Sequence, residues 1–151
     1  MKEQRLLASI KEPEIVRFCQ ELVRRKSVNP PGDELPVAEY IASTLKGFGL
    51  QVELVTHGPN RASVLARLKG RGGKPGLLFS GHLDTVPVGT QEWIHDPFLA
   101  EMAEGKIWGR GTVDMKGGLA ALIAAAKALA EARMPLGGDF IIAATAGEET
   151  D

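Results

Sequence analysis

The chain has 151 residues, of which 44% are apolar and 25% charged, and its formal net charge is −1. This length predicts one domain with a sizeable core, and the near-neutral charge argues against nucleic acid as a partner. The single cysteine excludes an internal disulfide bond and fits a cytoplasmic protein. The charged N-terminus lacks the apolar segment of a signal peptide, and the apolar run over 119–130 is too short to span a membrane, so no membrane partner is expected.

Two helices are predicted in the first third of the chain. Apolar residues recur at helical spacing over 12–26, and the two prolines of SVNPPGD end that helix. A second helix is predicted over 34–48, where glycines mark its end. Cys19 lies on the apolar face of the first helix, so we expect a buried structural thiol rather than a nucleophile.

Two strands with alternating polarity follow the second helix. Residues 50–56 (LQVELVT) and 62–68 (ASVLARL) alternate apolar and polar side chains, as half-buried strands do. The basic residues near 67–74 predict a solvated turn after the second of these strands. The next run, GLLF at 76–79, is continuously apolar and predicts a central strand that is covered on both faces.

A hairpin, a helix and a final strand complete the predicted elements. Residues 98–108 read as a hairpin with its turn at Glu104 and Gly105. The Ala- and Leu-rich segment 118–133 predicts a helix, and DFIIAATA at 139–146 predicts a second continuously apolar strand. The alternation of helices and buried strands predicts an α/β fold with a mixed β-sheet sandwiched by helices.

Polar side chains gather where these apolar strands end. His82 and Asp84 follow the strand GLLF and, being two residues apart, point the same way in extended chain. Asp114 lies in a glycine-rich turn before the third helix, and Glu148 and Glu149 follow the last strand. If the two strands are parallel, their carboxyl ends share the edge of the sheet at which open α/β sheets bind ligands.

A histidine with several converging carboxylates is a ligand set for zinc, and cobalt and manganese suit the same donors. Neighbouring Glu148 and Glu149 diverge on extended chain, so one carboxylate can bind metal while the other acts as a base. Each residue also has a plain structural interpretation, such as a turn residue at Asp84 or a helix cap at Asp114. The segment GRGTVDMKGG lacks the spacing of a phosphate-binding loop, so a nucleotide-binding domain rests on its glycines alone.

Four motifs, in their order and spacing, resemble the M20 metallopeptidase family, which includes acetylornithine deacetylase, succinyl-diaminopimelate desuccinylase, aminoacylase and carboxypeptidase G2-like enzymes. They are SGHLDTVP at 80–87, Trp93 with the DPF of 96–98, GKIWGRGTVDMKGG at 105–118 and GEE at 147–149. The resemblance covers nearly the whole chain. It implies a zinc exopeptidase-like catalytic domain that hydrolyses N-acyl amino acids or C-terminal peptide bonds.

The resemblance also implies a role for each matching residue. His82 is similar to a terminal ligand of one zinc ion, and Asp84 to the residue that orients its imidazole. Asp114 resembles the carboxylate that bridges two zinc ions. Glu148 resembles the general base, and Glu149 resembles a terminal ligand of the other ion.

The chain departs from the family in its length. Family members are more than twice as long, and carry two further metal ligands downstream and an inserted lid or dimerisation domain. His57 and His95 lie upstream of the missing ligands and are poor substitutes; we expect His95 to be a surface loop residue. Residues 1–151 therefore correspond to the N-terminal part of the catalytic domain, with the lid domain and the C-terminal part absent.

Two consequences are expected of such a part. An apolar sheet edge or face should be uncovered, which favours a homo-oligomer or association through the exposed sheet surface. The chain alone should have little or no activity. The alternative to a hydrolase is therefore a catalytically incomplete fragment that acts only as a metal-binding or assembly module.

Overall fold

The computed structural model describes residues 2–150. Four α-helices and one short π-helical turn are present in this part of the chain: α1 Lys2–Ser9, α2 Glu12–Arg24, α3 Leu35–Gly47, η1 Thr112–Lys116 and α4 Gly117–Glu131. The strands are β1 Gln51–Gly58, β2 Arg61–Leu68, β3 Leu77–His82, β4 Glu101–Ala103, β5 Lys106–Trp108 and β6 Phe140–Thr145. All the predicted helices and strands are confirmed, and α1 is an addition that the sequence patterns did not indicate.

The main sheet has the strand order β1-β2-β6-β3, and β4 and β5 form the predicted separate hairpin. Strands β1, β2 and β6 are antiparallel neighbours, whereas β3 runs parallel to β6. The predicted mixed sheet of an α/β fold is thereby confirmed. Leu77 pairs with Phe140 and His82 with Thr145, so β3 and β6 begin and end together. Their carboxyl ends therefore share one edge of the sheet.

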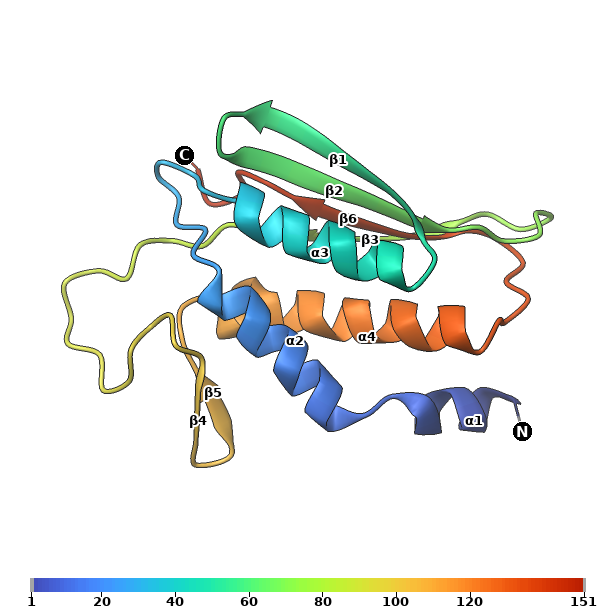
Figure 1. Cartoon of the computed structure of the whole chain (residues 1–151), viewed down its shortest axis with the longest axis horizontal. Helices are drawn as coiled ribbons and strands as arrows, with labels where there is room; N and C mark the ends of the chain where they lie inside the picture. Colours follow the sequence, from blue (N-terminus) through green and yellow to red (C-terminus); the bar gives the residue numbers. More distant parts are fainter. Residues whose placement is uncertain (1, 151) are drawn as a thin grey trace.

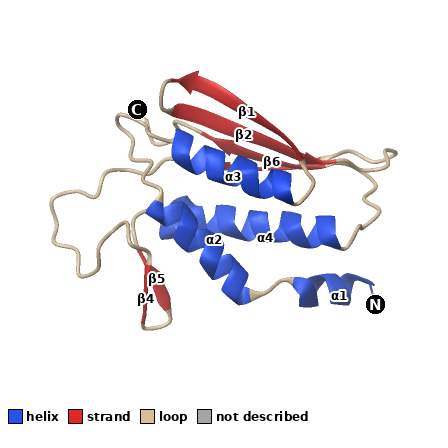
Figure 2. Cartoon of the chain, viewed as in Figure 1, coloured by secondary structure: helices blue, strands red, loops and turns tan. Residues whose placement is uncertain are grey.

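The helices lie against one face of this sheet (Figures 1 and 2). Helix α3 packs on β1 and β2, helix α4 packs beneath β3 and β6, and α2 packs on α4. Alternate side chains of the inner strands point toward the helices and form the core: Ala62, Val64 and Ala66 of β2, and Phe140, Ile142 and Ala144 of β6. The opposite face of the sheet leaves apolar side chains such as Leu65 exposed.

Strand β3 differs from its prediction. The continuous apolar run predicted a central strand covered on both faces, but β3 is an edge strand of the described sheet. The side chains of Leu77, Leu78 and Phe79 are 57%, 54% and 38% exposed. Apolar composition shows what a strand is suited to contact, not whether a neighbour is present. The expected uncovered apolar edge is therefore observed at β3, and the other edge strand, β1, is also more exposed than predicted.

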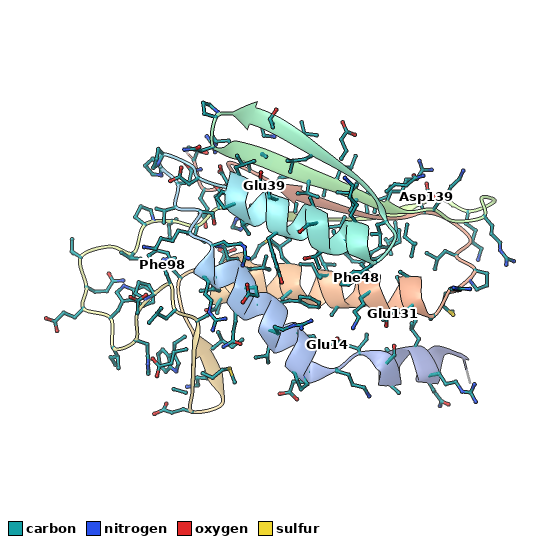
Figure 3. All side chains as sticks on the ribbon, in the orientation of Figure 1. Glu14, Glu39, Phe48, Phe98, Glu131 and Asp139 are labelled. Atoms are coloured by element: carbon teal, nitrogen blue, oxygen red, sulfur yellow. The ribbon has the colours of Figure 1, made fainter. Side chains whose placement is uncertain are left out.

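The three longer helices, α2 to α4, are held together by apolar contacts, and an ion pair joins α2 to α4. Cys19 of α2 is buried, and burial raises the pKa of its thiol, as expected of a structural cysteine. Lys127 of α4 donates to the carboxylate of Glu14 on α2, which is labelled in Figure 3. Among the described residues, no helix combines the length and the apolar character needed to cross a membrane.

Candidate metal centre

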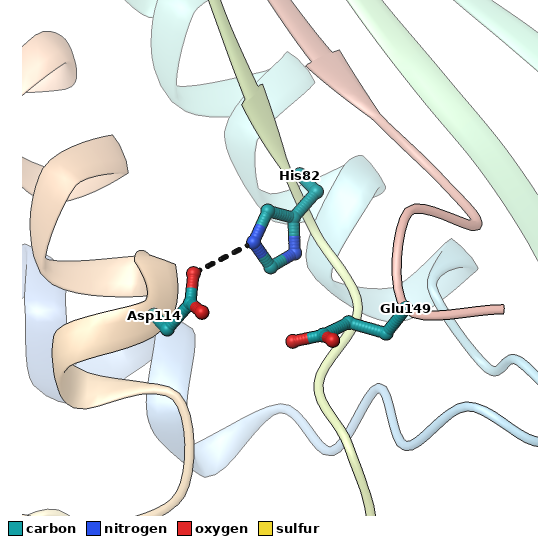
Figure 4. A group of neighbouring side chains, drawn as sticks. All are labelled: His82, Asp114 and Glu149. Carbon is teal, nitrogen blue, oxygen red and sulfur yellow. Dashed lines mark hydrogen bonds and ion pairs between the residues drawn. The ribbon is translucent and has the colours of Figure 1, made fainter.

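Three side chains converge at the edge where β3 and β6 end. His82 is the last residue of β3, Asp114 comes from the turn η1 before α4, and Glu149 comes from the turn after β6. Figure 4 shows the three side chains pointing toward one another. One donor atom from each lies within 4.8 Å of the others, and His82 Nε2 is 2.9 Å from Asp114 Oδ1.

The imidazole of His82 is buried and held in one orientation. Its Nδ1 atom lies 3.0 Å from the backbone carbonyl oxygen of Asp84, which can only accept a hydrogen bond. Nδ1 therefore carries a proton in either charge state of the ring, and Nε2 faces the carboxylate of Asp114. Burial lowers the pKa of His82, but the hydrogen bonds that its ring donates to Asp114 and to the Asp84 carbonyl, with the charges of both carboxylates, outweigh burial and raise the pKa.

The carboxylate of Asp84 is fully buried and ties the two strand ends together. It accepts hydrogen bonds from the backbone N–H groups of Glu148 at 3.2 Å and Glu149 at 2.9 Å, and from the side-chain amide of Asn29 at 2.8 Å. Burial favours the neutral acid, but these donors outweigh it and hold the pKa of Asp84 below its usual range. Asp84 thus orients His82 through its carbonyl and the Glu148–Glu149 turn through its carboxylate.

The turn that carries Asp114 is fixed by a buried lysine. Lys116 is 1% exposed, and its Nζ donates to the backbone carbonyl of Arg25 at the end of α2. Burial lowers the pKa of this ammonium group to about 8. Gly111 begins the turn with a φ of 83°, a left-handed conformation that glycine adopts without a steric penalty. The Asp114 side chain itself is 76% exposed, so it is accessible from solvent.

The charges at this edge favour a bound cation. Burial raises the pKa of Glu149, and the nearby carboxylates of Asp114, Glu148 and Asp84 raise it further against the lowering effect of His82. A divalent cation would relieve this repulsion, and one imidazole nitrogen with two carboxylate oxygens suits zinc or a similar ion. A cavity of about 300 Å³ adjoins the group and is lined by Val86, residues 109–114 and Glu149. The residues present therefore fit a divalent cation.

Of the residues that the sequence singled out, Glu148, His57 and His95 lie outside the converging group found among the described residues. Glu148 is exposed and lies outside the converging group, although its backbone is bound to Asp84. His57 is exposed on β1, where its imidazole forms a hydrogen bond with the hydroxyl of Ser63. His95 lies in a loop, where its imidazole forms a hydrogen bond with the carboxylate of Glu101. Within the part of the chain that the structure describes, neither histidine is part of the converging group.

Asn29 is the residue of this site that the sequence patterns did not indicate. It lies in the segment SVNPPGD, which the sequence patterns predict to end α2, and its side-chain amide donates to the buried carboxylate of Asp84. Asn29 follows α2 and directly precedes two prolines, and nothing in this local sequence indicates a contact with Asp84. The family resemblance, which extends over this segment, was the one available indication.

A histidine and two carboxylates at the carboxyl edge of a mixed α/β sheet define a candidate metal centre of the metallopeptidase kind. The chain matches the model of peptidase family M20/M25/M40 over residues 78–151. It is 36% identical to succinyl-diaminopimelate desuccinylase of Methylobacterium radiotolerans over 139 residues, which are 89% of this chain and 34% of the relative. The resemblance based on the sequence motifs is thereby confirmed.

Solved structures agree with this assignment. Human carnosine dipeptidase 1 matches with a TM-score of 0.78 and 26% identity over 97% of this chain and 34% of its own. An M20 family metallo-carboxypeptidase from Sulfolobus solfataricus matches with a TM-score of 0.75 and 26% identity over 87% of this chain and 30% of its own. The chain thus spans about a third of the length of the relatives that it matches.

Proposed function

We propose that this chain forms part of a metal-dependent hydrolase that cleaves amide bonds in N-acyl amino acids or at the C-terminus of peptides. The observation that carries the proposal is the convergence of donor atoms from His82, Asp114 and Glu149 within 4.8 Å. The names of a desuccinylase, a dipeptidase and a metallo-carboxypeptidase among the relatives support the same class of reaction.

In this proposal His82, Asp114 and Glu149 would hold zinc, and cobalt or manganese would suit the same donors. When bound, such ions polarise a carbonyl oxygen and make water more acidic. Glu148 takes a proton from the attacking water and returns it to the leaving nitrogen. Asp84 keeps His82 Nε2 directed toward the carboxylates that would share an ion with it, and fixes the backbone that presents both glutamates.

The proposal extends to the organisation of the protein. Residues 1–151 correspond to the N-terminal part of a catalytic domain, and further ligands and a lid are supplied by other segments, as the length of the relatives suggests. The protein acts in the cytoplasm, and the exposed edge of β3 is where this chain associates with itself or with another segment.

The test uses the full-length protein that carries these residues. Glu148→Gln removes the base but keeps the side-chain size, so kcat for an N-acyl amino acid or dipeptide should fall by about 100-fold to 10,000-fold. Metal content, measured by mass spectrometry of the purified protein, should stay unchanged. Glu39→Gln is the matched control, because Glu39, labelled in Figure 3, is an exposed glutamate on α3 that is not part of the converging group.

Retained turnover in Glu148→Gln would overturn the assignment of the base. Absence of metal-dependent turnover in the wild-type protein would overturn the hydrolase proposal itself. That second outcome would favour the alternative, a metal-binding or assembly module.

A further inference from the structure

We infer that Asn29 is a positioning residue, which sets the place of Glu149 and Glu148 by holding the carboxylate of Asp84. The inference rests on the metal site proposed above and adds a residue to its support. Asn29 lies in the loop between α2 and α3, far along the chain from the groups that it orders.

The loop that carries Asn29 is fixed to the segment after β3. The backbone N–H of Asn29 donates to the carbonyl of Thr85 at 2.9 Å, and Val28 forms an isolated parallel bridge with Thr85. Asn29 is 1% exposed, so its side chain is removed from solvent. Its carboxamide therefore approaches Asp84 from a backbone that is hydrogen-bonded to the segment after β3.

The carboxamide joins the two strand ends. Nδ2 donates to Asp84 Oδ2 at 2.8 Å and to Thr150 Oγ1 at 3.1 Å, so both of its hydrogens are used. Asp84 Oδ2 also accepts from the backbone N–H of Glu149. Asn29 thus contacts Asp84, which accepts the hydrogen bond from the Glu149 N–H, and also Thr150, the residue that follows Glu149.

The orientation of the amide is fixed by charge. The opposite orientation would place Oδ1 of Asn29 against the carboxylate of Asp84, where two acceptors repel each other. In the observed orientation, Asn29 Oδ1 is buried and has no hydrogen-bond partner among the described residues, which itself costs stability. The amide therefore keeps the hydrogen bond from Nδ2 to Asp84 although its Oδ1 atom stays without a partner among the described residues. A residue that positions Asp84 requires this hydrogen bond.

A matched pair on the surface provides the control. Asn60 Nδ2 donates to Asp33 Oδ1 at 3.2 Å in an exposed pair of the same chemistry. Asn29→Asp and Asn60→Asp both place a carboxylate against an aspartate without changing side-chain size. The first repels Asp84, and the second affects a pair that touches neither glutamate.

The experiment has one arm that needs no metal. Amide hydrogen exchange is measured by NMR in the metal-free chain for Glu148, Glu149 and, as a reference in the central strand β6, Ile142. Asn29→Asp should raise exchange at the two glutamate amides by about tenfold, while Ile142 stays within about twofold of wild type. Asn60→Asp should change none of the three.

The second arm measures the dissociation constant of Co²⁺ by visible absorption. Asn29→Asp should weaken Co²⁺ binding by about 10-fold to 100-fold, as loss of a group that supports a ligand does, and Asn60→Asp should not. Asn29→Ala, which removes the donor without adding charge, should act in the same direction in both arms.

The outcomes separate the two proposals. Failure of the wild-type chain to bind Co²⁺ would overturn the metal site, and the exchange arm would still decide the role of Asn29. Unchanged exchange at Glu148 and Glu149 in both Asn29 variants would overturn the inference. A rise at Ile142 equal to that at the glutamates, or failure of both variants to fold, would show a general folding role and overturn it equally.

Discussion

His82 Nε2 lies 2.9 Å from Asp114 Oδ1, although 32 residues separate the two along the chain. The contact arises because β3 ends at His82 while α4, which follows the turn with Asp114, packs directly beneath that strand. Gly81 permits this approach, since a Cβ there would lie 2.9 Å from the methyl carbon of Met115. The two side chains therefore meet at one edge of the sheet, facing Glu149.

The His82–Asp114 contact predicts a pH dependence of stability in the metal-free chain. The pKa of His82 is raised in the folded state, so the pair stabilises fully below about 6.5, the pKa of an unfolded histidine. The contribution is lost as the pH rises through the raised pKa. Because Asp114 is mostly exposed, we expect less than about 1 kcal/mol.

Asp114→Asn removes the charge that raises this pKa. The difference in unfolding free energy between wild type and Asp114→Asn, measured with urea, should be larger at pH 6 than at pH 8. His57→Ala controls for titration elsewhere. A difference that stays constant with pH would show that His82 and Asp114 are not coupled.

Gly111 is required by the turn that presents Asp114. Its φ is 83°, and a Cβ there would lie 2.6 Å from Cγ2 of Thr85, so Gly111→Ala should cost about 1–3 kcal/mol of unfolding free energy. Gly47→Ala is the control, because a Cβ at Gly47 meets nothing within 4 Å in α3. That change should be neutral or stabilise by up to about 1 kcal/mol. Equal effects in urea unfolding would contradict the role of Gly111.

The exposed edge of β3 predicts self-association of this chain. Leu78 is 54% exposed beside unpaired backbone, so Leu78→Lys should lower the fraction of dimer or larger species in sedimentation velocity. Ile94→Lys is the control, since Ile94 is 90% exposed in a loop away from the sheet. A chain that sediments as a monomer at all concentrations, or equal effects of both changes, would exclude association through β3.

Local patterns in the sequence were sufficient for most of the fold. Apolar spacing predicted α2, α3 and α4, and the β4–β5 hairpin followed from its turn at Glu104 and Gly105. The place of β3 at the edge could not be predicted, because a continuous apolar run is the same whether or not a neighbouring strand is present. Helix α1 was missed because its charged residues obscure any apolar stripe.

The site was predictable in part for a similar reason. Parallel strands end at one edge, so the approach of His82 to Glu149 followed once β3 and β6 were paired correctly. The hydrogen bonds that the backbone N–H groups of Glu148 and Glu149 donate to Asp84 could not be predicted. They depend on the path of a turn 64 or more residues away, which no spacing within either motif encodes.

The most direct test of the account is a Co²⁺ titration of the metal-free chain followed by visible absorption. The account predicts a ligand-field band that saturates in wild type and in His57→Ala, an exposed histidine outside the group. In His82→Ala the affinity should fall by more than about 100-fold, beyond the effect of losing a supporting residue. Equal binding by His82→Ala and wild type, or the absence of a saturable band in wild type, would contradict a metal centre at His82, Asp114 and Glu149.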